Sequence, residues 1–483
     1  MGLNNNGFCK KLEVEILKKV LAILFSVLLV TASFASCASE ADISGGESGN
    51  FGSETYGDTD VIYDGALSND GANSGANSGA NQNAGNTSEG DGGSSSKPAV
   101  TNVKDSSAGL QFTLNADGVS YTLTGKGTFS GTDLVVDGYK GLPVTKIGYG
   151  VFADDSKLKT IKIGNYVEEI DDHAFSMCKA VTSVTMGSNV KVIGVYAFRY
   201  CQAITSIDLS ANVQVLKYGA FYKASKLATI KVSDKLRYIG EYAFSNTAYY
   251  NDSSKWSSNI LYLGNHLIEA KSSVSGKPTI KSGTVSIAEK AFTLATGITG
   301  VSIPDSVKSL SPNAFFKCRS LKSVSGGNGL TYVGDNAFAE TSFQKTSSNY
   351  KNNLLYVGKC VVDANTSLSG SPSFASGTIA IADMAFASCA KITEVNIPEG
   401  VVYVGRYAFL NCEKLAKVTV PSSVKEIGAY AFKGCSVLTD VTMKKTSSWT
   451  ADGVSVSSSL LSDKAKAAME IAMTSASKTW LNA

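Results

Sequence analysis

Cysteines show the most regular spacing among the side chains that could do chemistry. Six of the nine lie three residues after a recurring phenylalanine: Cys178, Cys201, Cys318, Cys389, Cys412 and Cys435. Other copies of this position hold Asp155, Ala224, Thr247, Ala295 or Thr341. The position therefore favours a small residue rather than a thiolate. On a ladder of repeats these side chains would point the same way, which suits neither a disulfide nor a tetrahedral zinc site. We expect reduced, buried cysteines that act as small core residues.

The two histidines, His173 and His266, are the other candidates for acid–base chemistry. Asp171, Asp172 and His173 form a compact titratable cluster, but no nucleophile with a matched base recurs near it. No phosphate-binding glycine loop, carboxylate dyad or metal-ligand spacing stands out. The sequence therefore predicts no catalytic, cofactor-binding or metal-binding residue. A hydrolase whose carboxylates meet across repeats is the last alternative.

Phenylalanine marks a repeat of 23 residues that must position all of these side chains. After Phe152, ten phenylalanines that each follow an alanine recur at intervals of 23, with two intervals of 48. We predict that these ten form the structural core: Phe175, Phe198, Phe221, Phe244, Phe292, Phe315, Phe338, Phe386, Phe409 and Phe432. An aliphatic residue lies five positions before each, and a strand-like stretch with alternating apolar residues follows most of them.

One repeat buries too little apolar surface to fold alone, so neighbouring repeats must cover each other's faces. The constant spacing places phenylalanine over phenylalanine and isoleucine over isoleucine in successive repeats. The strands then form a parallel ladder with a spacing of about 4.8 Å.

The pattern Cys-x-x-Leu-x-x-Ile-x-Ile-x-x-x-Val-x-x-Ile-Gly-x-x-Ala-Phe resembles the BspA-like, or treponeme-type, class of leucine-rich repeat over about residues 109–445. The resemblance implies a leucine-rich-repeat solenoid over 106–445. We expect short parallel β-strands stacked in a right-handed coil, with two expanded repeats of 48 residues and a C-terminal helical cap. The family further implies an extracellular or surface protein. Some members are adhesins that bind host matrix proteins, host cells or other bacteria.

The two expanded repeats are related by a constant offset of 94 residues, so that Tyr262 aligns with Tyr356 and Pro278 with Pro372. The stretch from Ile260 to Ile268 reads as two short strands around a Gly-Asn turn. We predict a projecting loop in each repeat. The loops carry the candidate ligand-binding aromatics Tyr249, Tyr250, Trp256, Phe343 and Tyr350. The alternative is that these rings pack back onto the solenoid.

The N-terminus is typical of an exported protein. Four lysines precede an apolar run over 20–30, and small residues lead directly to Cys37, which resembles a bacterial lipobox. We predict a lipoprotein signal peptide over 1–36, with Cys37 as the lipidated residue; an ordinary signal peptide is the alternative. Residues 37–105 are rich in Gly, Ser and Asn, and we expect a disordered tether. The chain carries a net charge of +3, residues 1–37 carry +2 and residues 38–100 carry −9, which leaves +10 for residues 101–483.

Residues 446–483 are predicted to cap the open end of the solenoid. A helix over 463–473 with Ser462 as N-cap is expected, and Trp449 and Trp480 are expected to pack against the last repeat.

The outward strand positions should present the ligand-binding face. They hold Lys162, Thr185, Asp208, Lys231, Ser302, Ser325, Asn396, Thr419 and Thr442. The sequence therefore predicts a monomeric, non-enzymatic protein on the outer face of a bacterial membrane. It would bind an extracellular protein or glycan, touch the membrane only through its lipid, and bind no nucleic acid or cofactor. The alternatives are a glycan-capture lipoprotein for nutrient uptake and a structural envelope protein without a specific ligand.

Overall fold

The computed structural model describes residues 103–474 and 476–482. The predicted signal peptide, Cys37 and all but residues 103–105 of the predicted tether lie outside the described residues. Within the described part no helix has the length and apolar character needed to cross a bilayer.

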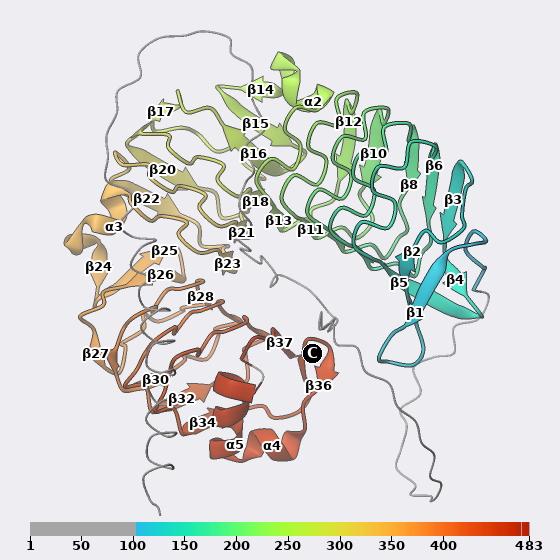
Figure 1. The fold of residues 1–483 in the computed structure, drawn as a ribbon. Coiled ribbons are helices and arrows are strands. Elements are labelled where there is room, and N and C mark those ends of the chain that lie inside the picture. Colours follow the sequence, from blue (N-terminus) through green and yellow to red (C-terminus); the bar gives the residue numbers. More distant parts are fainter. Residues whose placement is uncertain (1–102, 475, 483) are drawn as a thin grey trace, which may run out of the picture. The chain divides into compact units, whose positions relative to one another are not determined.

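Each repeat forms one turn, here called a rung, and the rungs follow one another as a leucine-rich-repeat solenoid (Figure 1). A short strand precedes the phenylalanine of each rung and a longer strand follows it. Within the runs of 23-residue repeats most of these strands pair in parallel with their counterparts in the next rung: Ile170 lies beside Ile193, and Ile207 beside Ile230. The expected solenoid of 23-residue repeats is therefore confirmed.

The short strands of the repeats are β5 (Leu142–Ile147), β7 (Glu169–Ile170), β9 (Val192–Ile193), β11 (Val215–Leu216), β13 (Tyr238–Ile239), β18 (Ser286–Ile287), β21 (Ser309–Leu310), β23 (Tyr332–Val333), β28 (Ala380–Ile381), β31 (Tyr403–Val404) and β33 (Glu426–Ile427). The longer strands are β3 (Asp133–Val136), β6 (Thr160–Ile163), β8 (Ser183–Thr185), β10 (Ser206–Leu209), β12 (Thr229–Val232), β20 (Gly300–Ile303), β22 (Ser323–Gly326), β30 (Glu394–Asn396), β32 (Lys417–Val420) and β34 (Asp440–Met443). Before the first full rung lie β1 (Gln111–Leu114), β2 (Tyr121–Gly125) and β4 (Gly138–Tyr139). Strand β2 joins the ladder by pairing in parallel with β5.

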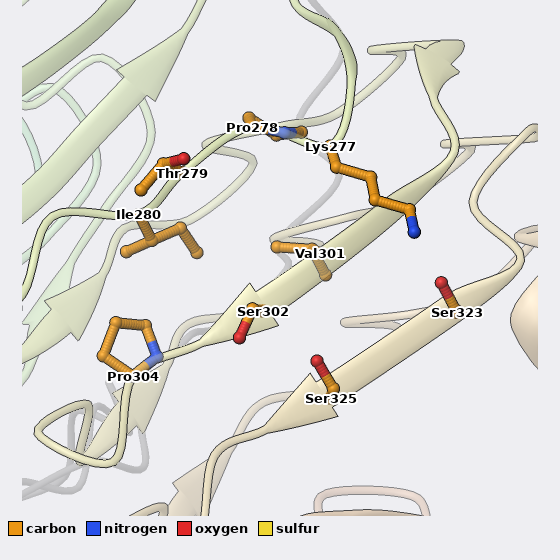
Figure 2. A pocket seen from close by; sticks show the side chains of 9 residues that line it. All are labelled: Lys277, Pro278, Thr279, Ile280, Val301, Ser302, Pro304, Ser323 and Ser325. Atoms are coloured by element: carbon orange, nitrogen blue, oxygen red, sulfur yellow. The ribbon is translucent and has the colours of Figure 1, made fainter.

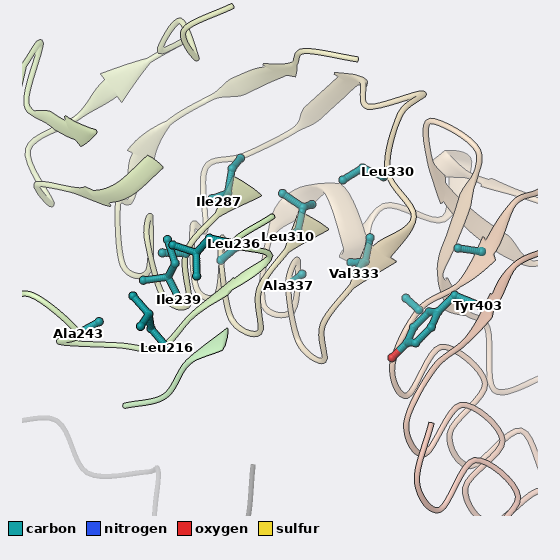
Figure 3. Packing of buried hydrophobic residues seen from close by; sticks show 14 of the residues in the cluster. Leu216, Leu236, Ile239, Ala243, Ile287, Leu310, Leu330, Val333, Ala337 and Tyr403 are labelled. Carbon is teal, nitrogen blue, oxygen red and sulfur yellow. The ribbon is translucent and has the colours of Figure 1, made fainter. Parts of the chain in front are cut away.

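The recurring phenylalanines lie in the core, with at most 4% of each side chain exposed. Within each run of 23-residue repeats the neighbouring rings are stacked, with centroids 4.8–5.8 Å apart and planes within 18° of parallel. The aliphatic column beside them continues across the first expanded repeat, from Leu216 and Ile239 to Ile287, Leu310 and Val333 (Figure 3). One apolar core therefore runs through the repeats.

Two positions in every rung adopt left-handed backbone conformations, two residues before and two residues after the phenylalanine. In the rung of Phe175 these are His173 and Met177, with φ of 59° and 62°. The N–H groups of these residues and of Phe175 donate to the carbonyls of Val195, Arg199 and Ala197 in the next rung, at 2.7–2.9 Å. The turns thus form a hydrogen-bonded ladder of their own, and their side chains are held at fixed positions.

Each expanded repeat contains an antiparallel hairpin, which the Gly-Asn turn predicts in the first repeat. In the first, β15 (Ile260–Leu263) pairs with β16 (His266–Ala270), and β16 pairs in parallel with β18. The rest of this repeat contains α2 (Ala248–Asn251), the 3-10 helix η1 (Ser253–Lys255), β14 (Trp256–Ser257), β17 (Ser275–Gly276) and β19 (Gly297–Ile298). The second has the same order: α3 (Ser342–Lys345), η2 (Ser347–Asn349), β24 (Tyr350–Lys351), β25 (Leu354–Val357), β26 (Cys360–Ala364), β27 (Ser369–Gly370) and β29 (Lys391–Ile392).

The last rung is followed by β35 (Trp449–Ala451), β36 (Val454–Ser455), α4 (Ser458–Ser462), α5 (Lys464–Met469), the π-helical turn η3 (Glu470–Thr474) and β37 (Trp480–Asn482). The expected N-cap at Ser462 is wrong. Asp463 caps α5 instead, because its carboxylate accepts the N–H groups of Ala465 and Lys466, while Ser462 ends the preceding helix. Strand β37, which the sequence did not predict, pairs antiparallel with β33 and β35.

Candidate binding surface

The repeat cysteines are free and buried. The thiol of Cys201 donates to the carbonyl of Phe175, 26 residues earlier, at 3.2 Å, and Cys178 makes the same contact to Phe152 at 3.0 Å. Burial raises the pKa of Cys178 to about 12 and that of Cys201 well above the usual value. Neutral thiols fixed to backbone carbonyls are poor nucleophiles, so these residues serve packing.

The histidines also have structural partners. His266 is buried, with Nδ1 2.8 Å from the Ser286 hydroxyl and Nε2 3.0 Å from the Ser233 carbonyl oxygen. Burial lowers the pKa of both histidines. Asp172 accepts the Val195 N–H at 2.7 Å and thereby supports the turn that contains it. In the described residues no three His, Cys, Asp or Glu side chains are grouped so that they could hold a metal ion.

The outward positions of the longer strands form a polar face. Lys162, Thr185, Asp208, Lys231 and the equivalent residues up to Asn396 are exposed, while Thr419 and Thr442 are half-buried. A shallow hollow of about 260 Å³ lies on this face beside the first expanded repeat (Figure 2). Its lining includes the hydroxyls of Ser302, Ser323 and Ser325, together with Lys277.

The aromatics of the first expanded repeat are half-buried and hydrogen-bonded within the fold. The hydroxyl of Tyr249 donates to the Tyr262 carbonyl at 2.6 Å, and that of Tyr250 donates to Glu269 at 2.8 Å. The indole of Trp256 donates to the carbonyl of Tyr250. These hydrogen bonds hold the loop against the hairpin. The polar atoms of the three side chains therefore already have partners inside the repeat.

The aromatics of the second expanded repeat have equivalent roles. Phe343 is buried, 5% exposed, against Phe338, so it does not form the projecting anchor that the sequence suggested. The hydroxyl of Tyr350 donates to Asp363 at 2.6 Å, and Gln344 donates to the same carboxylate at 2.9 Å. Asp363 is the counterpart of Glu269 at the offset of 94, and burial raises the pKa of both carboxyls.

A second acid in each expanded repeat, Glu289 in the first and Asp383 in the second, connects the short strands on either side of that repeat. The parallel ladder of short strands is interrupted there. The N–H of Asp383 donates to the carbonyl of Val333 at 3.0 Å. The Asp383 carboxylate accepts the hydroxyls of Tyr403 at 2.6 Å and Tyr332 at 3.3 Å. Burial raises the pKa of Asp383 to about 7, against the opposing effects of the Tyr403 hydrogen bond and the Arg406 charge. Glu289 bonds Tyr238 in the same way in the first expanded repeat, and burial raises its pKa as well.

The turns of the first five rungs carry a connected group of rings that the sequence reading overlooked. This tyrosine strip consists of Tyr149, His173, Tyr196, Tyr200, Tyr218, Tyr222 and Tyr242. From Tyr149 through His173, Tyr196 and Tyr218 to Tyr242, successive ring centroids are 5.2–5.5 Å apart. Tyr149 is 70% exposed and Tyr242 45%. The signal in the sequence was an aromatic residue beside the repeat phenylalanine in consecutive repeats.

Two cations lie on the tyrosine strip. The Arg199 guanidinium lies over the rings of Tyr196 and Tyr200, 4.7 and 4.9 Å from their centroids. The Lys223 ammonium lies 5.2 and 5.1 Å from the centroids of Tyr200 and Tyr222. Lys223 also donates to the hydroxyl of Tyr200 at 3.1 Å, which lowers the pKa of that phenol.

Comparison with protein families identifies a repeat family in the chain. The model of the BspA type leucine-rich repeat region, in six copies, matches residues 145–275, 284–371 and 364–462. No curated protein sequence matches the chain.

Solved structures of bacterial repeat proteins also align with the chain. A leucine-rich repeat protein of T. pallidum aligns at 20% identity and a TM-score of 0.31, over 48% of this chain and 85% of its own. A leucine-rich cell surface protein of Faecalibacterium prausnitzii A2-165 aligns at 22% identity and a TM-score of 0.25, over 72% and 97%. The pneumococcal vaccine antigen PcpA aligns at 14% identity and a TM-score of 0.27, over 67% and 90%.

Proposed function

The chain belongs to the family of proteins with a BspA type leucine-rich repeat region, and we propose that it is a non-enzymatic binding protein of the bacterial cell surface. Its ligand is an extracellular protein, so that the protein attaches the cell to host proteins, host cells or other bacteria.

The observation that carries this proposal is the separation of buried and exposed positions within each rung. The phenylalanine, the aliphatic residue and the small residue of every repeat are buried. The strand position between two inward-facing apolar residues is exposed in most rungs, as at Lys162, Thr185 and Asp208. Stacked repeats therefore present a long polar face that can vary without loss of the core, which is the arrangement repeat proteins use for binding.

A non-enzymatic role is supported by the state of the groups that could do chemistry. The described cysteines are buried, and burial raises the pKa of most of these thiols. The half-buried carboxyl of Asp363 and the buried carboxyl of Asp383 are hydrogen-bonded to tyrosines of the scaffold. These contacts hold the groups in fixed positions within the fold.

The attachment to the cell is proposed from the first part of the sequence. In this proposal residues 1–36 are removed, Cys37 carries the lipid, residues 37–105 are the tether, residues 106–445 bind, and residues 446–483 cap the repeats. Metabolic labelling with palmitate tests the anchor in the wild type and in Cys37→Ser. Label in the wild type alone is expected, and an unlabelled wild type would contradict lipidation.

Binding is tested by applying the purified full chain to arrays of host matrix proteins and of glycans. Saturable binding to a protein, followed by loss of cell attachment in a deletion strain, is the expected result. Binding to glycans alone would replace the proposal by glycan capture for nutrient uptake. Binding to neither array would favour a structural envelope protein and overturn the proposed function.

A further inference from the structure

We propose that the tyrosine strip is a docking surface for an extended, acidic segment of a partner protein. This inference rests on the proposed binding function and names the surface and the chemistry of its ligand. It differs from the sequence-based expectation, which placed the ligand on the strand face and on the aromatics of the expanded repeats.

The backbone conformation of the turns does not by itself explain the tyrosines of the strip. The position two residues before the phenylalanine is left-handed throughout, and it is filled by Gly150, Gly219 or Asn313 in some rungs and by Lys290, Met384, Tyr407 or Tyr430 in others. Tyr196 and Tyr242 adopt the same conformation with φ of 54° and 58°. A bulky residue in this region costs about 1–2 kcal/mol, which a ring–ring contact of about 0.5–1.5 kcal/mol offsets only in part. Glycine or asparagine would suit this backbone better than tyrosine, so the turn alone does not explain the rings.

The charges of the strip favour an anionic partner. Among the described residues neither Arg199 nor Lys223 forms an ion pair with a carboxylate, and both lie over tyrosine rings. The nearby acids are already engaged: Asp172 with the Val195 N–H, and Glu241 with Lys290. Two cations without carboxylate partners can therefore accept carboxylates from outside. The net charge of +10 on residues 101–483 would steer an acidic partner toward this surface.

The arrangement of the rings favours a protein segment over a sugar chain. A sugar stacks on an open ring face, but Arg199 or Lys223 lies over Tyr196, Tyr200 and Tyr222. Tyrosine and arginine together are the residues most enriched at the centres of protein interfaces. Five rungs at about 4.8 Å give a strip roughly 20 Å long, the span of about six extended residues.

The test measures fluorescence anisotropy of a labelled peptide of about twelve residues, in which Glu alternates with Leu, titrated with the full chain. A peptide with Gln in place of Glu is the negative control. Two variants remove the proposed contacts: Arg199→Gln with Lys223→Gln, and Tyr196→Asn with Tyr242→Asn. The second keeps the turn because asparagine occupies the same left-handed position at Asn313 and Asn336. Lys317→Gln is the matched control, because Lys317 lies at the position of Lys223 and over the Phe316 ring, but in a rung without the strip.

We expect the Glu peptide to bind the wild type, to bind each double variant at least tenfold more weakly, and to bind Lys317→Gln normally. Added salt should weaken the binding, since it depends on charge. Thermal melting by circular dichroism shows that each variant is folded. Equal binding to the wild type and both double variants, or no binding to the wild type, would overturn the proposal. So would displacement of the peptide by heparin with heparin binding lost in the same variants, because the occupant would then be a sulfated glycan.

Failure of the tyrosine-strip proposal can be distinguished from failure of the proposed binding function. If a matrix protein binds the wild type and both double variants equally, the chain is a binding protein whose site lies elsewhere. If no array ligand binds at all, the proposed function fails whatever the peptide does.

Discussion

At the scale of single residues, the buried phenylalanine column contributes strongly to stability. Phe221 is fully buried and stacks on Phe198 at 5.3 Å and on Phe244 at 5.8 Å. Phe221→Ala removes both contacts and leaves a cavity that neighbouring rungs can close only in part, so we expect a loss of about 3–5 kcal/mol. The midpoint of urea unfolding, followed by circular dichroism, measures this loss. The exposed Thr185→Ala is the control and should change stability by less than about 0.5 kcal/mol.

The cysteine position should tolerate a smaller residue. Ala224 occupies it in the rung after Cys201, and both side chains are fully buried. We expect Cys201→Ala to lower stability by less than about 1.5 kcal/mol, because the loss of a small sulfur and of one weak S–H donor is partly offset by relaxation. Native Cys201 should resist iodoacetamide at pH 8 and react after unfolding, as peptide mass spectrometry would show. Rapid alkylation of the native protein would contradict the buried, neutral thiol.

The sequence could predict the cysteine position because eleven copies of it could be compared. Alanine and threonine at the same position showed that size matters there and sulfur does not. The tyrosine strip was harder to recognise, since its rings come from several positions around the phenylalanine. Only the structure shows that they form one surface, because the turns place the rings of Tyr218 and Tyr222 5.2 and 6.3 Å from that of Tyr196.

At the scale of elements, the expanded repeats depend on buried acids, and this makes stability depend on pH. Burial raises the pKa of Asp383 to about 7 in the folded protein, whereas an unfolded aspartate titrates near about 3.9. The folded state therefore holds the proton more tightly, and the stabilisation is complete below the unfolded pKa. It is lost as pH rises toward the folded pKa, so the melting temperature should fall between about pH 4 and pH 7.

Asp383→Asn should flatten this dependence, because the amide stays neutral and can still accept the hydroxyl of Tyr403. Melting temperatures of the variant and the wild type at pH 5 and pH 8 test the idea. Asp208→Asn is the control: this carboxyl is exposed, and hydrogen bonds from Ser210 lower its pKa. A variant with the same pH profile as the wild type would show that Asp383 is ionised in the fold at both pH values.

The hairpins of the expanded repeats could be predicted from the sequence, but the roles of their aromatics could not. A Gly-Asn turn between apolar stretches is a local signal, and β15 and β16 pair around it. Whether Tyr250 faces solvent or Glu269 depends on a contact 19 residues along the chain. In the second repeat Gln344 replaces that tyrosine and bonds the equivalent Asp363. The element that both expanded repeats share is the half-buried acid with its donor, and the aromatic ring is one way to supply the donor.

At the scale of the whole molecule, the repeats form one stacked array whose ends must be closed. At the C-terminal end Trp480 and Trp449 are each 1% exposed, and their ring centroids lie 6.4 Å apart. Strand β37 pairs with the short strand β33 of the last rung and with β35. This strand, rather than helix α5 alone, therefore covers the edge that the ladder would otherwise leave open.

Trp480→Ala should consequently loosen the array from this end. Each rung is stabilised mainly by its neighbours, so a lost cap weakens the nearest rungs first and distant rungs little. We expect faster amide hydrogen exchange over residues 403–443 and unchanged exchange over 160–209, with a loss of about 3–5 kcal/mol in the stability of the C-terminal rungs. Val454→Ala, at an exposed position of the same segment, is the matched control. Faster exchange spread evenly over all rungs would mean that the repeats unfold as one unit, and unchanged exchange would mean that α4 and α5 close the end without β37.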